Sequence, residues 1–115
     1  MKRGDVFWAD LVPRSGSEQT GRRPVIIVSH NGFNQTPKWR SIIVVPISTS
    51  GSQALRSLTT VPLPIGAGSL ARLSTAICHQ VTTLDRSKVS EQIGRLTPEL
   101  LRAVEAGLKA SLDLD

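Results

Sequence analysis

The sequence predicts a mainly β fold, in which a small, strongly bent sheet or barrel is followed by one helix. β-Branched runs at residues 24–29 and 39–48 are typical of buried strands. Glycine and proline clusters divide the first part of the chain into five or six short strands. The last part instead repeats leucine and valine at helical spacing. Short strands that end in one helix favour a barrel or a curled sheet.

Polar loops separate the expected strands. In chain order, the strands cover residues 4–11, 24–29, 39–48, 58–64, 70–81 and 90–96. Prolines at the end of the strand at 58–64 predict an edge strand, because proline cannot donate to a β-ladder. The connections are expected to be a loop with room for a helical turn at 30–38, a polar loop at 48–57, and a turn at 82–89.

The expected helix begins at a clear start signal. Thr97 is a good N-cap, and Pro98 then occupies the first helical position, where its missing N–H costs nothing. Leu101, Val104, Leu108 and Leu112 recur on one face, which we expect to pack on the sheet, and Glu105 and Lys109 are spaced as an ion pair on the other.

Length and composition predict one domain covering residues 1–115, large enough to bury a core without metal or disulfide staples. The one cysteine, Cys78, cannot form an internal disulfide, which fits a reducing compartment. The first residues contain no apolar signal segment, and the longest apolar runs are too short to span a membrane. The expected location is the cytoplasm.

The net positive charge lies entirely in the first half of the chain. Residues 1–60 hold eight basic and three acidic side chains, whereas residues 61–115 hold six of each. This asymmetry favours a basic surface for an acidic partner, most commonly nucleic acid or an acidic protein segment. The alternative is that the charge serves solubility alone.

The stretch GSEQTGRRP at 16–24 concentrates polar chemistry at the entrance to a strand. Its glycines allow a sharp turn, and Pro24 biases Arg23 toward extended backbone. An arginine held in this way presents a planar fork that suits bidentate binding of phosphate. The alternative is a surface ion pair between Arg23 and Glu18.

Two further groups of polar residues lie at or near the ends of expected strands. Ser48, Thr49 and Ser50 come directly after VVPI and could donate to a phosphoryl oxygen, although ordinary loop capping explains them equally well. His79 and Gln80 lie late in the strand expected at 70–81, where a lone histidine is more often structural than catalytic. Cys78 and His79 would point to opposite faces of that strand, and no metal-ligand spacing, phosphate loop or nucleophile elbow is present.

Taken in order, RGDVFWADLVP, GSEQTGRRPVIIVS, VVPIS, HQV and IGRLTPELLRAVEAGL resemble the MazF/PemK family of toxin–antitoxin endoribonucleases over essentially the whole chain. The resemblance implies an SH3-like β-barrel of five to seven strands with a C-terminal helix. It also implies a homodimer that cleaves single-stranded RNA without a metal or other cofactor. The expected partner is a cognate antitoxin with an acidic, flexible C-terminal segment.

The family motif assigns roles to particular residues. Arg23 matches the catalytic arginine, and Ser48 stands where the family has a catalytic threonine, with Thr49 as the neighbouring hydroxyl. The motif itself assigns no general base; Glu18, on the loop over the RNA groove, and His79, which belongs to no family catalytic pattern, are the candidates for that role. The residues expected to touch RNA are Gln19, Arg22, Asn34 and Gln80. The resemblance further implies attack by the RNA 2′-hydroxyl on the adjacent phosphate, giving 2′,3′-cyclic phosphate and 5′-hydroxyl ends.

Two other functions compete with the nuclease. One is a gyrase poison of the same barrel superfamily, which depends on an aromatic C-terminal tail; this chain ends in SLDLD. The other is a basic module that binds RNA without cutting it, which composition does not exclude. The matches at Arg23 and Ser48 favour the enzyme over both.

Overall fold

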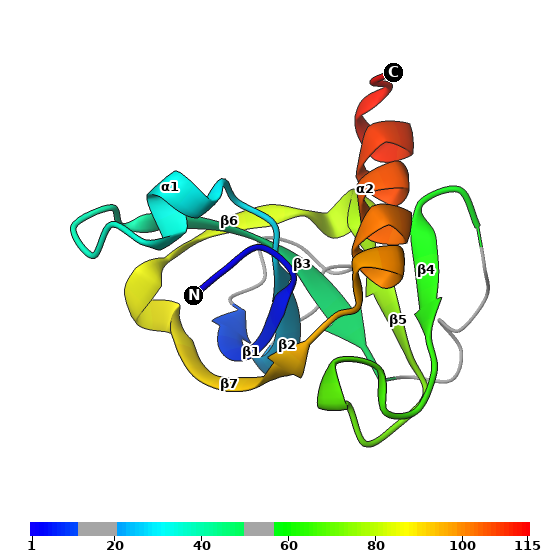
Figure 1. The fold of residues 1–115 in the computed structure, drawn as a ribbon, viewed down its shortest axis with the longest axis horizontal. Helices are drawn as coiled ribbons and strands as arrows, with labels where there is room; N and C mark the ends of the chain where they lie inside the picture. Colours follow the sequence, from blue (N-terminus) through cyan, green and yellow to red (C-terminus); the bar gives the residue numbers. More distant parts are fainter. Residues whose placement is uncertain (12–20, 50–56) are drawn as a thin grey trace.

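Seven antiparallel strands and a C-terminal helix make up the part of the chain that the computed structural model describes, residues 1–11, 21–49 and 57–115 (Figure 1). The strands are β1 (Asp5–Leu11), β2 (Gly21–Ile27), β3 (Ser41–Ser48), β4 (Thr60–Leu63), β5 (Ser74–Ile77), β6 (Thr82–Asp85) and β7 (Val89–Arg95). The helical segments are α1 (Asn31–Asn34), the 3-10 turns η2 (Ala67–Ser69), η3 (Cys78–Gln80) and η4 (Arg86–Lys88), and α2 (Pro98–Leu112). The predicted fold class is confirmed.

The sheet curls because β3 pairs with different strands along its length. Its order is β4-β5-β3-β2-β1-β7, and β6 pairs with the first half of β3 while β5 pairs with its last two residues. The pairing of β1 with β7 shifts register twice, at Val6/Phe7 and Phe7/Ala9, which bends this side of the sheet. β4 is an edge strand, as its prolines predicted.

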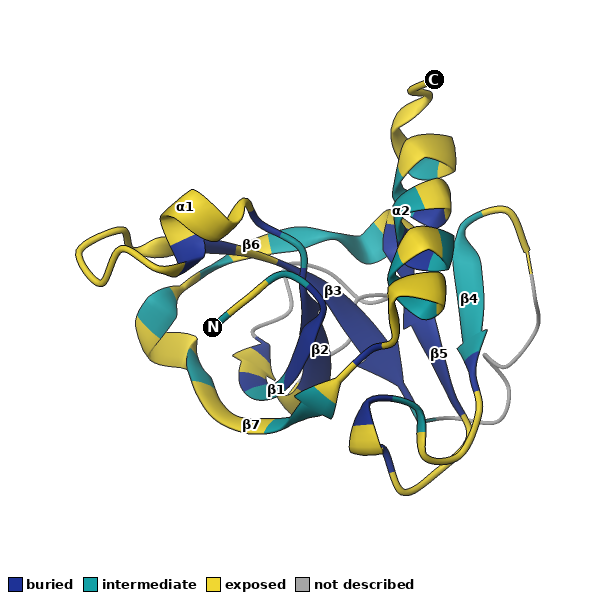
Figure 2. Cartoon of the chain, in the orientation of Figure 1, coloured by how far each residue is buried: buried dark blue, intermediate teal, exposed yellow. Residues whose placement is uncertain are grey.

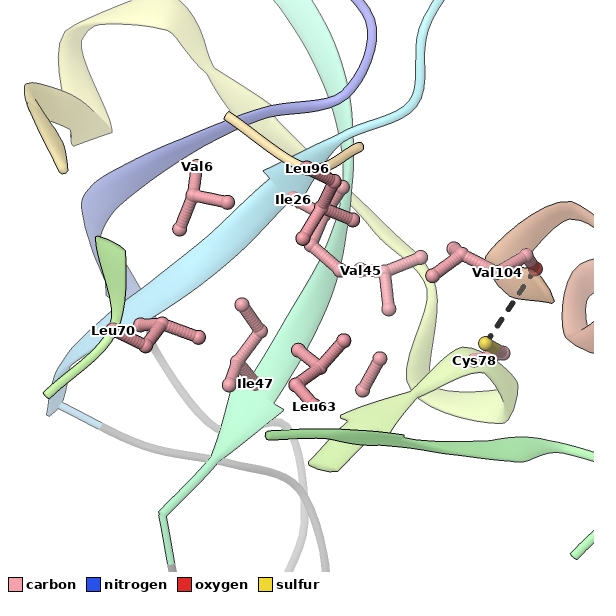
Figure 3. Close-up of a cluster of buried hydrophobic side chains, with 10 residues drawn as sticks. Val6, Ile26, Val45, Ile47, Leu63, Leu70, Cys78, Leu96 and Val104 are labelled. Carbon is pink, nitrogen blue, oxygen red and sulfur yellow. Dashed lines mark hydrogen bonds between the residues drawn. The ribbon is translucent and has the colours of Figure 1, made fainter. Parts of the chain in front are cut away.

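Both faces of the central strands are buried, which explains their unbroken runs of β-branched residues (Figure 2). Ile26 and Val45 belong to one core cluster, whereas their chain neighbours Val25, Ile27 and Val44 belong to a second one. Period-2 alternation therefore sends successive side chains into two separate cores. The first of these is the cluster shown in Figure 3.

Helix α2 begins as predicted and closes the first core. The Thr97 hydroxyl accepts a 3.3 Å hydrogen bond from the Leu100 amide, and Val104 is fully buried. Leu112 does not join this face: 56% of it is exposed, because the helix projects beyond the sheet before it ends. Glu105 pairs with Arg3 at 2.7 Å rather than with Lys109, so this ion pair ties the helix to the N-terminal segment.

Two of the expected elements were wrong in extent. The strand predicted at 70–81 is limited to β5, because η3 turns the chain away from the edge of β3. Cys78 and His79 therefore lie on a 3-10 turn and not on opposite faces of a strand. The turn predicted at 82–89 contains β6, which pairs with β3 from Ser41 to Val44, and only then turns through η4. Within the described ranges, no helix is both long and apolar enough to cross a membrane.

The thiol of Cys78 is sealed beneath α2, where it donates to the Val104 carbonyl at 3.6 Å (Figure 3). Burial raises the pKa of this thiol to about 11, so it stays protonated until the solution pH approaches that value. We expect iodoacetamide at pH 8 to leave the native protein unlabelled and to label it fully in guanidinium chloride. Rapid labelling of the native protein, followed by mass spectrometry, would contradict this packing.

Candidate active site

The two residues that the family motif singles out lie at the same end of neighbouring strands. The register between β2 and β3 runs from Ile27↔Val44 to Val25↔Pro46. Arg23 and Ser48 each lie two residues beyond this last pair, one on each strand. Because the strands are antiparallel, both residues reach the same end of the sheet, and the equal offset gives them the same face.

The two side chains differ in exposure. Arg23 is exposed, as a residue at the entrance of β2 should be, whereas only 2% of Ser48 is accessible. Ser48 also pairs with Thr75 on the other edge of β3. The Thr75 hydroxyl is buried and has no hydrogen-bond partner among the described residues, so an unused donor lies beside Ser48.

A groove with a volume of about 320 Å³ opens beside these strand ends. Pro24 and Thr49, the chain neighbours of Arg23 and Ser48, line it together with Trp8, Leu70, Arg72 and Ile93. Alternation along a strand puts Arg23 and Ser48 on the face opposite Pro24, so they lie next to two lining residues in the chain but are not part of the lining themselves. The walls are largely apolar, which suits a flat ring or a nucleobase.

Two arginines, Arg22 and Arg72, lie at this groove. The Arg22 guanidinium lies over the Trp8 ring, 4.5 Å from its centroid, in a cation–π contact. In the register between β2 and β1, Arg22 is paired with Asp10 and Arg23 with Ala9. Arg72 forms part of the opposite wall, in the segment after η2. The groove therefore combines an apolar floor with cationic rims, which is suited to an unstacked nucleotide and its phosphates.

The wall that holds Arg72 depends on close backbone contact. Gly94 in β7 packs directly on the η2 turn, and a Cβ at this position would come within 2.6 Å of the Gly68 carbonyl carbon and of Ser69 Oγ. The turn itself contains left-handed residues, Gly68 at φ +56° and Ser69 at φ +62°. From the sequence, the glycines in GAGSL predict only a turn. In the structure, this turn positions the wall of the groove that contains Arg72.

The remaining candidate residues lie in different places. His79 is exposed on η3, and its Nδ1 and the Thr59 hydroxyl are 2.8 Å apart. Gln80 is half-buried on the same turn. Thr75 pairs with Ser48 at the end of β3, and His79 comes four residues later in the chain, on the turn after β5. Within one chain, His79 therefore lies away from the end of β3 that carries Ser48. Glu18 and Gln19 fall outside the described residues, as does Ser50.

Asn34 has a structural role that the sequence did not reveal. Only 2% of it is exposed, and its amide donates to the Ser29 carbonyl at 2.8 Å and to Asn31 Oδ1 at 3.2 Å. Its own Oδ1 accepts from the Ser29 hydroxyl. These bonds hold α1 against the start of the loop and leave little of the Asn34 side chain exposed, while its expected contact with RNA stays a prediction.

Sequence reasoning missed Arg72 as a groove residue and did not place Trp8 at the groove. Both lie in segments that the pattern assigned to the scaffold, and only the pairing of distant strands brings them to Thr49. A signal for Trp8 was present, since it falls inside the motif RGDVFWADLVP. Among the residues that the structure covers, no group of three histidine, cysteine or carboxylate side chains is arranged to hold a metal ion.

Comparison with known proteins identifies the family. The profile of the PemK-like, MazF-like toxins of type II toxin–antitoxin systems matches residues 2–112. The chain belongs to this family. Its curated relatives include endoribonuclease EndoA of Bacillus subtilis, 32% identical over 114 residues that cover 99% of this chain and 96% of the relative. Endoribonuclease MazF6 of Mycobacterium tuberculosis is 28% identical, with 99% and 98% covered. The protein is thus a MazF/PemK-like toxin, homologous to endoribonucleases.

Solved structures support the same fold. A crystal structure of MazF from Deinococcus radiodurans aligns with a TM-score of 0.79 at 24% identity, covering 99% of this chain and 97% of that one. An endoribonuclease from a mycobacterial species, solved in complex with its cognate antitoxin, aligns with a TM-score of 0.78 at 23% identity, covering 100% and 97%. At these identities the likeness establishes the MazF-like fold of this chain.

Proposed function

We propose that this MazF/PemK-like toxin is a sequence-specific endoribonuclease that cuts single-stranded RNA, including mRNA, in the cytoplasm and thereby inhibits translation and growth. The observation that carries the proposal is the shared position of Arg23 and Ser48. They occupy the same end and the same face of β2 and β3, beside a groove rimmed by arginines. Family membership and the endoribonuclease relatives supply the reaction class.

The proposed reaction uses a nucleophile that the RNA itself provides. The 2′-oxygen attacks the adjacent phosphorus, the bond from phosphorus to the 5′-oxygen breaks, and the products are a 2′,3′-cyclic phosphate and a 5′-hydroxyl. One proton leaves the attacking 2′-hydroxyl, and one is delivered to the departing 5′-oxygen. The protein needs no metal and no covalent intermediate for this step; it must align the groups and stabilise negative charge on the phosphoryl oxygens.

Arg23 is assigned the charge-stabilising role, because its guanidinium stays protonated and can grip two oxygens at once. Ser48 is assigned as a donor to a non-bridging oxygen, since it shares the face of Arg23, while Thr49 opens onto the groove and supports the bound nucleotide. Glu18, five residues before Arg23 in the chain, is the proposed general base. His79 is the weaker choice, because its turn lies away from the end of β3 and its Nδ1 already contacts Thr59.

Substrate preference follows from the same parts. An apolar groove with cationic rims holds an unstacked base while Arg22 and Arg72 contact the flanking phosphates. A duplex is a poor substrate because stacking keeps its bases out of the groove, and DNA lacks the attacking hydroxyl. The proposed assembly is a homodimer, and the proposed antitoxin inserts an acidic segment that competes with RNA for these arginines.

The decisive experiment is incubation of the purified chain with a long single-stranded RNA in excess EDTA. We expect discrete cuts whose ends carry cyclic phosphate and 5′-hydroxyl groups, identified by end labelling and mass spectrometry. Ser48→Ala and Thr49→Val are compared in the same assay, and the larger loss identifies the active hydroxyl. Binding without cutting would establish the non-catalytic module instead, and breakage of supercoiled DNA that requires gyrase would establish the poison.

A further inference from the structure

Two aromatic rings are stacked on the surface of the α1 loop, residues 30–40. The rings of Phe33 and Trp39 are parallel within 9° with centroids 4.2 Å apart, and 39% and 43% of these residues are exposed. The His30 ring lies 5.7 Å from Phe33 in a tilted arrangement. With only two phenylalanines and two tryptophans in the chain, half of the large aromatic side chains are placed on one exposed loop.

This loop is held rigidly by one arginine from η4. The Arg86 guanidinium donates four hydrogen bonds of 2.9–3.1 Å to the carbonyl oxygens of Phe33, Asn34, Thr36 and Trp39. The Trp39 indole N–H donates to the Ser41 carbonyl at 2.8 Å, which fixes the orientation of its ring. Stacked rings on a fixed backbone lose little conformational entropy when they bind a flat ligand.

The surroundings of the stack are basic. Lys38 and Arg40 are exposed on the loop itself, which contains no acidic residue, and Lys88 is exposed on η4. Asp85 is the nearby carboxylate, and Arg40 neutralises it in an ion pair of 2.9 Å. The Arg40 hydrogen bond and two further bonds from Ser87 hold the pKa of Asp85 well below its usual range. A polyanion therefore meets a surface of net positive charge.

The stack is separate from both the groove and the exposed aliphatic side chains. The α1 loop joins the ends of β2 and β3 that lie far from the groove. Ser48 comes seven residues after Ser41 along β3, which corresponds to about 23 Å at about 3.3 Å per residue. The highly exposed Leu58, Ile65 and Leu73 flank β4 and β5, on the opposite side of the molecule from α1. A large aliphatic interface with a protein would use that side instead.

We propose that the Phe33–Trp39 stack is a second RNA contact, which binds a base several nucleotides away from the cleaved phosphate. The inference rests on the proposed function for its ligand and adds a site remote from Arg23. Bases stack on exposed aromatic rings regardless of sequence, and the basic rim attracts the phosphates that connect them. The contact extends the bound length of RNA beyond the nucleotide held in the groove, and so raises affinity for long substrates.

The chain's two tryptophans make a direct test possible, because Trp8 reports on the groove and Trp39 on the stack. The protein is labelled with 5-fluorotryptophan, and Trp39→Phe assigns the two ¹⁹F signals. The probe is a 20-nucleotide 2′-O-methyl RNA of randomised sequence, which cannot be cut. We expect both signals to shift, and the Trp39 signal to shift equally in an Arg23→Ala background. A Trp39 signal that stays fixed while Trp8 shifts would overturn the second contact and leave the nuclease proposal intact.

The affinity of the same RNA gives the second measurement. Trp39→Leu is expected to weaken binding at least fivefold and to raise KM for a long RNA without changing kcat, whereas Trp39→Phe retains most of the binding. Leu114→Ala, which removes an exposed apolar side chain elsewhere, is the matched control. Unchanged affinity of the Trp39→Leu variant for the RNA would refute the proposal. A ¹⁹F signal of Trp39 that shifts with protein concentration and not with RNA would refute it as well. A chain that binds the RNA at Trp39 but cuts no RNA would instead refute the nuclease.

Discussion

Replacing Arg23 with alanine is expected to slow RNA cleavage about 100- to 1000-fold, the cost of removing one preorganised donor from a site that stabilises developing negative charge. Arg23 is exposed at the entrance of β2 and belongs to neither of the two core clusters. The melting temperature should therefore remain within about 2 °C of the wild type, as expected for a surface substitution. Initial rates on a long RNA in EDTA, with the melting curve of the same preparation, provide the measurement.

Two other arginine substitutions act as controls for Arg23. Arg23→Lys keeps the positive charge but loses the planar fork, so it should recover only a small part of the rate. Arg102→Ala removes an exposed arginine from α2, away from the groove, and should cut RNA at the wild-type rate. Equal losses in Arg23→Ala and Arg102→Ala would mean that general charge, rather than a placed guanidinium, supports the reaction.

Replacing Gly94 with alanine is expected to destabilise the fold by roughly 2–3 kcal/mol, which lowers the melting temperature by about 8–12 °C. The new methyl group would lie against the Gly68 carbonyl group and Ser69 Oγ, and a backbone carbonyl cannot rotate away as a side chain can. Relief requires η2 to move, and η2 leads directly into the groove wall that contains Leu70 and Arg72. KM for RNA should therefore rise even at temperatures where the variant is folded.

The matched control for this prediction is Gly32→Ala. A Cβ at Gly32 would meet only the ring of His30, at 2.9 Å, and that ring is the end of a movable side chain. Its effect on the melting temperature should be clearly smaller than that of Gly94→Ala. If Gly94→Ala melts like the wild type and binds RNA normally, the close packing of β7 on η2 is not needed for the groove.

Much of the fold follows from local sequence. The runs at 24–29 and 39–48 are β-branched and buried on both faces, so they predict β2 and β3 without ambiguity. Thr97 and Pro98 fix the start of α2 because capping is a local interaction. By contrast, β6 is short, and its residues alternate between half-buried and exposed. It forms a strand because it pairs with the edge of β3. A partner so distant in sequence leaves no local signal.

The placement of the candidate site was predictable to the same extent. The roles of Arg23 and Ser48 come from the family motif and stay a prediction, whereas their position beside recognisable strands predicts a shared end of the sheet, which the register confirms. Trp8 and Arg72 line the groove only because β1 and the segment after η2 pack beside the end of β3. The hydrophobic periodicity of the sequence does not predict this packing between distant segments. Asn34 was assigned to RNA by its match to the family motif, and its burial and hydrogen bonds add a structural role that the motif did not predict. Residue type alone cannot distinguish an amide that binds a ligand from one that holds a turn.

A double-mutant cycle between Arg23→Ala and Ser48→Ala, measured as the cleavage rate of a long RNA in EDTA, tests most directly whether the two residues act on one phosphate. If both groups hold the same phosphoryl oxygens, loss of either one displaces the phosphate from the other. The double variant should then cut RNA within a few-fold of the slower single variant. Losses that simply multiply, with each variant fully folded, would show that Arg23 and Ser48 work independently and would contradict a shared catalytic site.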